Sequence, residues 1–290
     1  MQVNFSQKRI GVLGGGQLAR MLTLQGHKLG LQVHVLSENE NDPAAQVTHF
    51  WHKGHLNVHN DLKIFLKHVD VATFESEFID GLLLHEIGHE ISTPVHPRPM
   101  VMNSLRDRLK QKNLLKEHLL PHTKFVEFDV SCSWSSYKKI FPKGTVIKQN
   151  LFGYDGYGTF FVHTPNEHKK FIEKNYHPER SYIIEAFTPF KRELSLICCR
   201  NVSGQFITFP LAETFQKNGR CVWVKGPVHH KQQKQLINRC RKFLEALNYV
   251  GIMAFELFDT GKEILINELA PRVHNSGHHS LNSMNYDQFS

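Results

Sequence analysis

The sequence predicts two domains, an N-terminal α/β domain with a parallel sheet and a C-terminal α+β domain. Within residues 9–36 a short apolar strand, a glycine turn, a helical stretch and a second strand follow one another, which is the pattern of a βαβ unit. From Thr145 onward, short strands are interrupted by few helical stretches, which favours an antiparallel α+β arrangement. Three prolines within residues 94–99 indicate a boundary, so we predict domains at residues 1–103 and 104–290.

The elements of the first domain follow from apolar spacing and punctuation. Gly30 stands where the first helix should end, because glycine is favoured just after a helix C-terminus. The predicted elements are the strand Arg9–Leu13, the helix Gln17–Leu29, the strand Leu31–Leu36, the helix Leu62–His68 and the strand Val69–Phe74.

The second domain begins with an amphipathic helix rich in Lys and Arg, over Leu105–His118. The strands expected after it are Thr145–Lys148, Thr159–Val162, Tyr182–Phe187, Glu193–Cys199 and Gln205–Pro210. The chain then continues with a helix from about Lys231 to Leu247 and with the strands Gly251–Phe258 and Glu263–Glu268.

The composition excludes several classes of protein. The chain has 290 residues, 40% of them hydrophobic, but no apolar run approaches the roughly 18 residues of a membrane span, and no signal-peptide core is present. Its five cysteines form no CxxC pair, which argues against a disulfide framework and a structural zinc site and favours the cytoplasm. The net charge of +8 suits phosphate-bearing ligands, whereas the scattered basic residues argue against nucleic acid as a partner.

The glycine turn between the first strand and helix reads Gly14-x-Gly16-x-x-Ala19. Glycines let a backbone approach a phosphate closely, and a helix N-terminus carries partial positive charge. We therefore expect ligand or phosphate contact here, with Glu38 as a candidate for a ribose hydroxyl if the ligand is NAD. A plain strand-to-helix turn is the structural alternative.

Residues 85–89 match the zinc-protease pattern HExxH, with His85, Glu86 and His89 in the chemical positions. That chemistry requires both histidines on one continuous helix. Ile91–Thr93 and the prolines predict that any helix stops just after His89, and Gly88 resembles a helix terminator, so we interpret the match as coincidental.

A lysine and a glycine-rich loop form a more informative pair. Lys148 ends an apolar strand, where its ammonium group can meet nucleotide phosphates. The loop Gly153–Gly158 lies between two strands and can fold its backbone N–H groups over distal phosphates. A flexible hairpin beside an exposed lysine would show the same pattern.

Two carboxylates near the end of the chain give the most informative pattern. Glu256 lies within an apolar strand, where an unpaired charge is costly, and Asn267 and Glu268 end the partner strand. A five-residue connection would place Glu268 opposite Ala254 and make Glu256 its diagonal neighbour on the same face, roughly 7–8 Å away. Two such carboxylates can share Mg²⁺ ions that bind triphosphate oxygens. This hypothesis requires that the two groups face each other and that neither is already held in a salt bridge.

These stretches together resemble the ATP-grasp enzymes, and among them the N5-carboxyaminoimidazole ribonucleotide synthetase family of purine biosynthesis. The motifs that carry the resemblance are Gly14–Leu18 with Arg20 and Met21, Thr73–Glu77, Asp107–Leu109, Gly153–Gly158, Phe209–Leu211 and Ile266–His278. The last of them is long and unusual, and therefore highly specific. The resemblance implies a pre-ATP-grasp α/β domain, an ATP-grasp domain, and ATP-dependent carboxylation of aminoimidazole ribonucleotide by bicarbonate through carboxyphosphate.

The resemblance also implies residue roles. The residues that would contact ATP are Arg108, Lys148, Gly153, Tyr154, Asp155, Gly156, Tyr157, Gly158, Thr159, Glu185, Ala186, Phe187, Thr188, Glu193, Gln216, Asn267 and Glu268. Mg²⁺, with Mn²⁺ as an alternative ion, would be held by Glu256 and Glu268. Those implied in catalysis are Tyr154, Asp155, Arg272, His274 and Asn275, and those implied in substrate binding are Gln17 and Glu75.

The sequence departs from the family pattern at five positions. The lid carries Tyr157 and Thr159 where the family usually has a basic residue and Gln, and Gln216 aligns with a usual histidine. Ser76 and Phe78 replace the Phe and Asn of a usual Glu-Phe-Glu-Asn run. One phosphate-directed cation is therefore missing from the expected set.

The resemblance further implies a homodimer and a small C-terminal lobe that would follow Ser290 in a full-length relative. Two alternatives to a working ligase stay open at this point. The first is a catalytically impaired, nucleotide-binding paralogue, and the second is an NAD-linked oxidoreductase built on the glycine turn.

Overall fold

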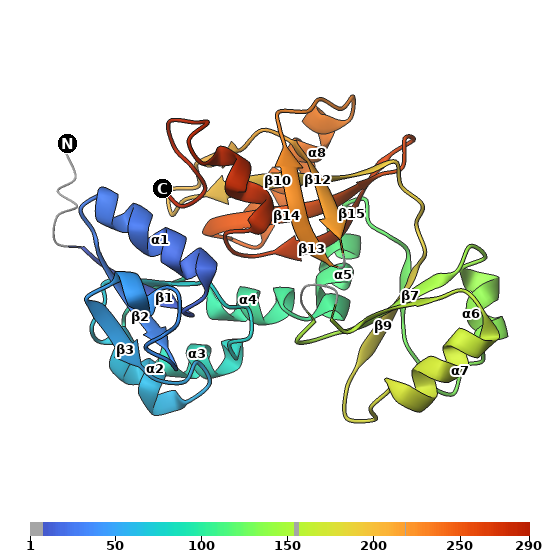
Figure 1. The fold of residues 1–290 in the computed structure, drawn as a ribbon, viewed down its shortest axis with the longest axis horizontal. Coiled ribbons are helices and arrows are strands. Elements are labelled where there is room, and N and C mark those ends of the chain that lie inside the picture. Colours follow the sequence, from blue (N-terminus) through green and yellow to red (C-terminus); the bar gives the residue numbers. More distant parts are fainter. Residues whose placement is uncertain (1–7, 154–156, 218) are drawn as a thin grey trace.

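The computed structural model describes residues 8–153, 157–217 and 219–290. Figure 1 shows an N-terminal lobe on one side, a small lobe on the other, and a third layer of strands between and above them. None of the helices in the described ranges combines the length and hydrophobicity needed to cross a membrane.

The N-terminal lobe is a parallel sheet with the strand order β3-β2-β1-β4-β5. Its strands are β1 (Arg9–Leu13), β2 (Gln32–Ser37), β3 (Phe50–Lys53), β4 (Val71–Phe74) and β5 (Val95–His96). Its helices are α1 (Gln17–Lys28), the 3₁₀ turn η1 (Ala45–Val47), α2 (His59–Leu66), α3 (Gly81–Ile87) and α4 (Pro99–Leu105). The predicted βαβ unit is confirmed, because β1 pairs in parallel with β2 and Gly30, at φ +76°, follows α1 as expected.

The small lobe is an antiparallel sheet with the order β6-β9-β7-β8 and two helices against it. Its elements are β6 (Phe125–Glu127), α6 (Trp134–Ile140), β7 (Thr145–Gln149), β8 (Thr159–Val162), α7 (Pro165–Lys174) and β9 (Tyr182–Ala186). Alternate residues of the strands divide between two faces. Ile147 and Ile184 pack with Phe171 of α7 in an aromatic core, whereas Lys148 and Glu185 face the other way.

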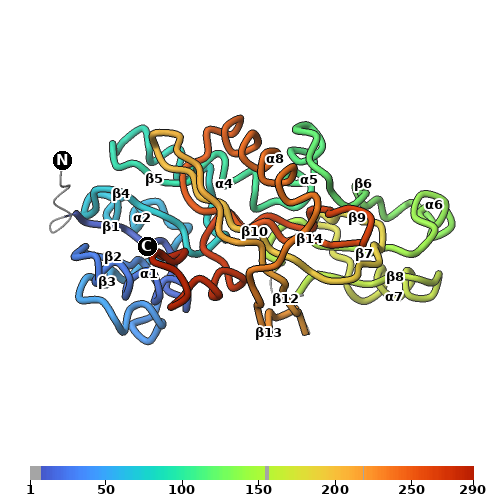
Figure 2. The backbone as a smooth tube through the Cα atoms, turned by 90° about the horizontal axis from the view of Figure 1, so that it is seen from above, coloured from blue at the N-terminus to red at the C-terminus, as the bar shows by residue number. Residues whose placement is uncertain are grey.

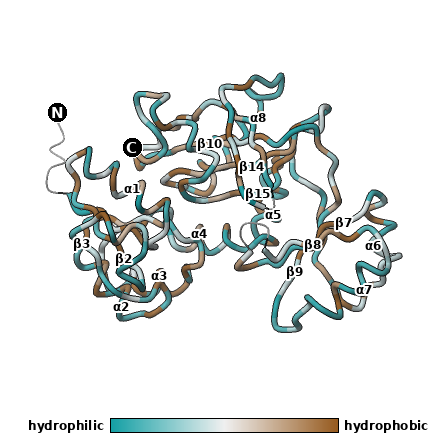
Figure 3. The backbone as a smooth tube through the Cα atoms, in the orientation of Figure 1, coloured by the Kyte–Doolittle hydropathy of each residue, from teal (hydrophilic) through white to brown (hydrophobic). Residues whose placement is uncertain are grey.

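The third layer is a six-stranded sheet, ordered β13-β12-β10-β14-β15 with β11 beside β10. Its strands are β10 (Arg192–Arg200), β11 (Phe206–Thr208), β12 (Ala212–Lys217), β13 (Arg220–Lys225), β14 (Gly251–Asp259) and β15 (Ile264–Ala270). One face packs on α5 (Arg108–Glu117) and α8 (Gln233–Ala246) in the largest core cluster. Figure 3 shows hydrophobic stretches in β14 and β15 of this sheet and more hydrophilic loops at the edge of the molecule.

The chain closes with a 3₁₀ segment, η2 (Asn275–Ser280), and a tail that returns to the first lobe. Phe289 packs with Leu18 of α1 and with Val273. Figure 2 shows the C-terminus lying beside α1 when the molecule is seen from above. The end of the described chain thus ties the N-terminal lobe to the third layer.

Candidate active site

A cleft of about 1010 Å³ lies between the small lobe and the six-stranded sheet. Lys148 and Glu185 line it from the small lobe, and Glu193, Glu256 and Glu268 line it from the larger sheet. The larger sheet can supply these polar groups because its strands alternate, with the opposite face buried in the core. The cleft also contains the following predicted site residues: Arg108, Gly153, Tyr157, Thr159, Ala186, Phe187, Thr188, Gln216, Asn267, Arg272, His274 and Asn275.

The two carboxylates predicted to face each other do so, but in a different register. Asp259 pairs with Ile264, so the turn is one residue shorter than the sequence analysis assumed, and Glu256 lies directly opposite Glu268 rather than diagonal to it. The register shifts between the two pairs, which places Asn267 as the extra residue of a β-bulge. The shorter turn alone would place Glu268 on the opposite face of the sheet from Glu256. The extra residue of the bulge shifts the register, so that Glu268 lies on the same face as Glu256.

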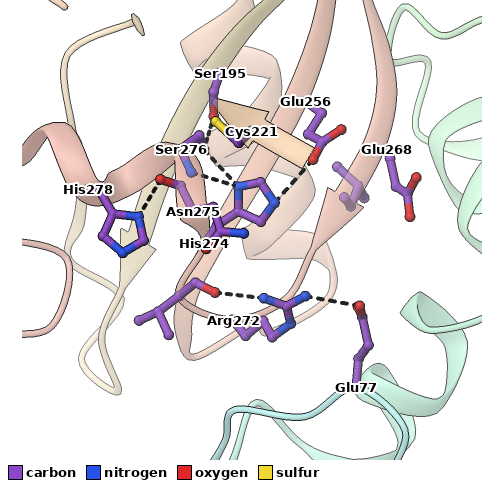
Figure 4. A network of polar contacts seen from close by, with 12 residues as sticks. Glu77, Ser195, Cys221, Glu256, Glu268, Arg272, His274, Asn275, Ser276 and His278 are labelled. Atoms are coloured by element: carbon purple, nitrogen blue, oxygen red, sulfur yellow. Dashed lines mark hydrogen bonds and ion pairs between the residues drawn. The ribbon is translucent and has the colours of Figure 1, made fainter. Parts of the chain in front are cut away.

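The expectation that neither carboxylate would be held in a salt bridge is wrong. Glu268 is bound by the Arg108 guanidinium at 3.0 Å. Glu256 is bound by His274 Nε2 at 3.1 Å (Figure 4). The Arg108 guanidinium and the hydrogen bond from His274 offset the repulsion between two carboxylates on adjacent strands. Each glutamate still exposes about a third of its side chain, 30% for Glu256 and 31% for Glu268. Two facing, partly exposed carboxylates beside an amide oxygen fit the oxygen-ligand preference of Mg²⁺.

The charge state of Glu256 supports the same fit. Burial alone would raise its pKa, but the hydrogen bond from His274 and the positive charges of Lys148 and Arg108 outweigh burial and lower it. Glu256 is therefore ionised at neutral pH.

Lys148 belongs to a buried polar network. Its ammonium group contacts Glu185 Oε1 at 3.0 Å and donates to Asn267 Oδ1 at 3.0 Å. Lys112, on α5, contacts the other oxygen of Glu185 at 3.0 Å. The two lysines outweigh the effect of burial and lower the pKa of Glu185 to about 2. The Glu185 side chain thus anchors Lys148, while the Glu185–Thr188 backbone lies along the cleft.

Glu193 occupies the middle of the larger sheet's cleft face, near Gln216. Burial and repulsion by Glu256 raise the pKa of Glu193 to about 7. Phe190 and Phe258 stack beside it with ring centroids 4.6 Å apart, and both line the cleft. The site therefore combines an apolar platform with a carboxyl group that titrates near neutrality.

The predicted lid is described only in part, because Tyr154, Asp155 and Gly156 lie outside the described residues. Arg108 donates to the carbonyl oxygens of Gln149 at 2.9 Å and Gly153 at 3.3 Å. A Cβ atom at Gly153 would lie 2.0 Å from Arg108 Nη1, so a larger residue at this position would displace the guanidinium. Gly158, at φ +73°, follows Tyr157 and leads into β8 at Thr159.

The run after β15 places Arg272, His274 and Asn275 along the cleft (Figure 4). Arg272 contacts Glu77 of the N-terminal lobe at 3.0 Å. His274 Nδ1 lies 2.8 Å from Ser276 Oγ, which lies 2.6 Å from Ser195 Oγ. The histidine ring is thereby fixed at both nitrogens.

The glycine turn of the first lobe already contains an anion, the carboxylate of Glu75. Gly16 N donates to Glu75 Oε2 at 3.4 Å, and a Cβ atom at Gly14 would lie 2.4 Å from the same oxygen. The expected phosphate contact is not supported at this turn, because a side chain of the protein fills the place. Burial raises the pKa of Glu75. Gln17 begins α1 with its side chain exposed, and neither it nor Glu75 belongs to the described wall of the cleft.

The two remaining motifs lie outside the described wall of the cleft. Glu38 lies 3.1 Å from His55 at the surface. Helix α3 ends at Ile87 with Gly88 as its C-cap, so Gly88 is the terminator, as predicted, and the helix stops earlier than expected, before His89. No group of three or more potential metal-ligating side chains occurs in the part of the chain that the structure describes. The zinc-protease alternative is thus unsupported.

Several residues of the cleft escaped the sequence analysis. Phe258 could have been found, because it is two positions from Glu256 on the same face of one strand. Lys112, Thr123 and Glu77 have no comparable signal, since each reaches the site through a contact distant in sequence.

Comparison with known proteins agrees with this geometry. Residues 7–105 match the model of the ribonucleotide synthetase preATP-grasp domain, and residues 113–289 match that of the ATP-grasp domain. The N5-carboxyaminoimidazole ribonucleotide synthase of Synechococcus elongatus is 34% identical over 97% of this chain and 71% of its own length. That of Saccharolobus solfataricus is 33% identical over 97% of this chain and 74% of its own.

Solved structures show the same likeness. N5-carboxyaminoimidazole synthetase of Staphylococcus aureus complexed with ADP superposes with a TM-score of 0.89 at 26% identity, over 97% of this chain and 75% of that one. The Aspergillus clavatus synthase in complex with ADP and 5-aminoimidazole ribonucleotide gives 0.88 at 25% identity, over 98% and 75%. The chain therefore belongs to the N5-carboxyaminoimidazole ribonucleotide synthase family of ATP-grasp proteins.

Proposed function

We propose that this protein carboxylates 5-aminoimidazole ribonucleotide with bicarbonate at the expense of ATP, in purine biosynthesis. One observation carries the proposal: a cleft in which facing Glu256 and Glu268 lie beside the cations Arg108 and Lys148. This is the charge arrangement that phosphoryl transfer requires.

The proposed reaction has two steps. A bicarbonate oxygen attacks the γ-phosphorus of ATP, and ADP leaves, which gives carboxyphosphate. The amine of the ribonucleotide then attacks the carboxyl carbon, inorganic phosphate leaves, and the amine loses a proton. The resemblance assigns Arg272, His274 and Asn275 to this end of the cleft. It also assigns Gln17 and Glu75, which lie outside the described wall of the cleft, to the ribonucleotide. Tyr154 and Asp155, which the resemblance also implicates, lie outside the described residues.

At the nucleotide end, Lys148 and Arg108 would neutralise phosphate charge. Glu256 and Glu268, with Asn267 beside them, would hold Mg²⁺, or Mn²⁺ in its place. When bound, the ion supplies charge stabilisation to the transferring phosphoryl group. The Glu185–Thr188 backbone would meet adenine and Glu193 the ribose.

Three further predictions remain part of the proposal. The domain limits are 1–103 and 104–290, the protein acts as a homodimer, and it works in the cytoplasm. The five cysteines are all free, as a reducing compartment would require.

The experiment is ADP release from ATP with Mg²⁺, measured with bicarbonate, and with or without aminoimidazole ribonucleotide. We expect ADP formation that depends on bicarbonate and rises with the ribonucleotide. ATP and ADP binding without any turnover would contradict the proposal.

A second candidate, a nucleotide-binding paralogue without turnover, is favoured by Tyr157 and Gln216, which stand where the resemblance expects a basic residue and a histidine. The variants Tyr157→Lys and Gln216→His test it. Gain of ADP formation by these variants from an inactive parent would support this candidate.

A further inference from the structure

Two buried glutamines each form a pair of hydrogen bonds with the main chain of one residue in the segment 267–275. Gln111 Nε2 donates to the carbonyl oxygen of Leu269 at 3.0 Å, and Leu269 N donates to Gln111 Oε1 at 2.8 Å. Gln288 Nε2 donates to the carbonyl oxygen of His274 at 2.7 Å, and His274 N donates to Gln288 Oε1 at 2.9 Å. The glutamines are 3% and 5% exposed.

The segment needs these partners because of its place in the fold. Strand β15 is at the edge of its sheet. On its outer side Ile266 bonds to the main chain of Pro121 and Thr123, whereas Leu269 has no neighbouring strand among the described residues. Past Ala270 the chain leaves the sheet altogether. Buried N–H and C=O groups without partners are costly, and a side-chain amide offers the same donor and acceptor as a peptide unit. Each glutamine side chain therefore supplies the hydrogen-bond partners that these backbone groups would otherwise lack.

Leu269 and His274, whose main chains the two glutamines hold, lie next to the carboxylates of the cleft. Leu269 follows Glu268 directly, and His274 directs Nε2 at Glu256, 3.1 Å away. The Ser276 N–H lies 3.3 Å from His274 Nδ1 and donates to it, which leaves the ring proton on Nε2. A small displacement of either backbone position would turn a carboxylate or an imidazole out of the cleft.

We propose that Gln111 and Gln288 are positioning residues, Gln111 for the Glu268 carboxylate and Gln288 for the His274 imidazole. The inference rests on the proposed function for its kinetic consequences, but its structural content is independent of turnover. Gln111 reaches the segment from α5, and Gln288 reaches it from the C-terminal tail, so the segment is held from two sides.

Gly277 supports the second half of the proposal. A Cβ atom built on Gly277 would lie 2.1 Å from Gln288 Oε1, so the amide fits only against a glycine. Ser280 Oγ accepts from Gln288 N at 3.1 Å and donates to the Gly277 carbonyl oxygen at 2.6 Å, which fixes both partners. The variant Gly277→Ala should therefore displace Gln288 without removing its amide.

The test compares Gln111→Met and Gln288→Met, which keep side-chain length but lose the hydrogen bonds. Gln25→Met is the matched control, because its amide donates to the exposed Ser290 and, among the described residues, makes no hydrogen bond to the segment 267–275. Mn²⁺ affinity in the presence of ADP is measured by electron paramagnetic resonance. The His274 ring is followed by ¹⁵N NMR, with its signals assigned by their loss in His274→Asn.

We expect Gln111→Met to weaken Mn²⁺ binding about tenfold or more, as loss of an outer support of a metal ligand does, with the His274 signals unchanged. We expect Gln288→Met and Gly277→Ala to replace the single Nε2–H form of His274 by a mixture of tautomers. They should also lower kcat more than they change KM for ATP.

Wild-type His274 signals in both Gln288→Met and Gly277→Ala would overturn the assignment of Gln288, and wild-type Mn²⁺ affinity in Gln111→Met would overturn that of Gln111. Equal changes of Mn²⁺ affinity and of the His274 signals in all variants, including Gln25→Met, would indicate general destabilisation and would overturn both assignments. Absence of bicarbonate-dependent ADP formation in the wild type would instead contradict the proposed function, while the NMR comparison would still decide the inference.

Discussion

Lys148 is the residue on which nucleotide affinity should depend most directly. It is held between Glu185 and Asn267 with only 8% of its surface exposed, so its position is set before any ligand arrives. We predict that Lys148→Met weakens ADP binding about 10- to 150-fold, the equivalent of one charge-assisted hydrogen bond. Calorimetric titration measures this. Lys143→Met, at an exposed turn before the same strand, is the control, and an equal effect of both variants would contradict the assignment.

Glu193 gives a pH dependence of known sign. The folded-state pKa of Glu193 is raised to about 7, from 4.5 in the unfolded chain. Between these two pH values the folded protein therefore keeps a proton that the unfolded chain has released. Its contribution to stability is therefore complete below the unfolded-state pKa of 4.5 and is lost as pH rises through 7. We predict that Glu193→Gln gains melting temperature relative to the wild type between pH 5.5 and pH 8. A difference that stays constant with pH would count against the raised pKa.

At the scale of single residues, the sequence predicted which residues form the site better than it predicted which of them contact one another. Glu256 and Glu268 were found because a carboxylate in an apolar strand requires a partner, but the partners Arg108 and His274 depend on three-dimensional proximity. Lys112, Gln111 and Gln288 could not be found at all, since an interior lysine or glutamine has no local signal that separates it from a surface one.

Helix α5 is the element that supplies the most polar groups to the site, with Arg108, Gln111 and Lys112 in its first turns. Asp107 caps it, accepting from Leu109 N at 2.9 Å and Lys110 N at 3.0 Å. We predict that Asp107→Ala lowers the free energy of unfolding by about 1 kcal/mol, and the melting temperature by about 2–3 °C. Asp107→Asn, which keeps an acceptor, should lose much less in thermal unfolding. Equal losses would show that the cap is not the cause.

The predicted limits of strands and helices agree with the structure for some elements and not for others. Strands with a clear apolar run, such as β1 and β8, were predicted to the residue. Helix α7 was missed although Thr164 and Glu167 form a capping box before it, a signal that was present in the sequence. The bulge at Asn267 could not be predicted, because it depends on the pairing of two whole strands.

At the scale of the whole molecule, an ion pair between Arg272 and Glu77 joins the segment that follows β15 to the N-terminal lobe. Arg272 and Glu77 expose only 18% and 22% of their side chains. We predict that Glu77→Ala lowers the free energy of unfolding by about 2–3 kcal/mol, because it leaves a mostly buried guanidinium without its partner. Denaturant unfolding checks this, with the exposed Glu86→Ala as control. A change below about 0.5 kcal/mol would mean that the lobes are joined by other contacts.

The lobe arrangement itself followed from the order of elements. Alternating strands and helices predicted the parallel first sheet, and strand-rich sequence predicted the antiparallel layers. The cleft between two sheets was not predictable from periodicity, because neither sheet's pattern specifies what it faces. It was anticipated only through the resemblance of the motifs to a known family.

We propose above that the facing carboxylates of Glu256 and Glu268 bind a divalent cation together with a nucleotide. The most direct measurement is calorimetric titration of the protein with ADP, in Mg²⁺ and in EDTA, for the wild type and for Glu256→Gln/Glu268→Gln. The account predicts that Mg²⁺ tightens ADP binding to the wild type about tenfold or more, equivalent to about 1.4 kcal/mol, and that the variant loses this difference. Equal affinity with and without Mg²⁺ in the wild type would contradict it.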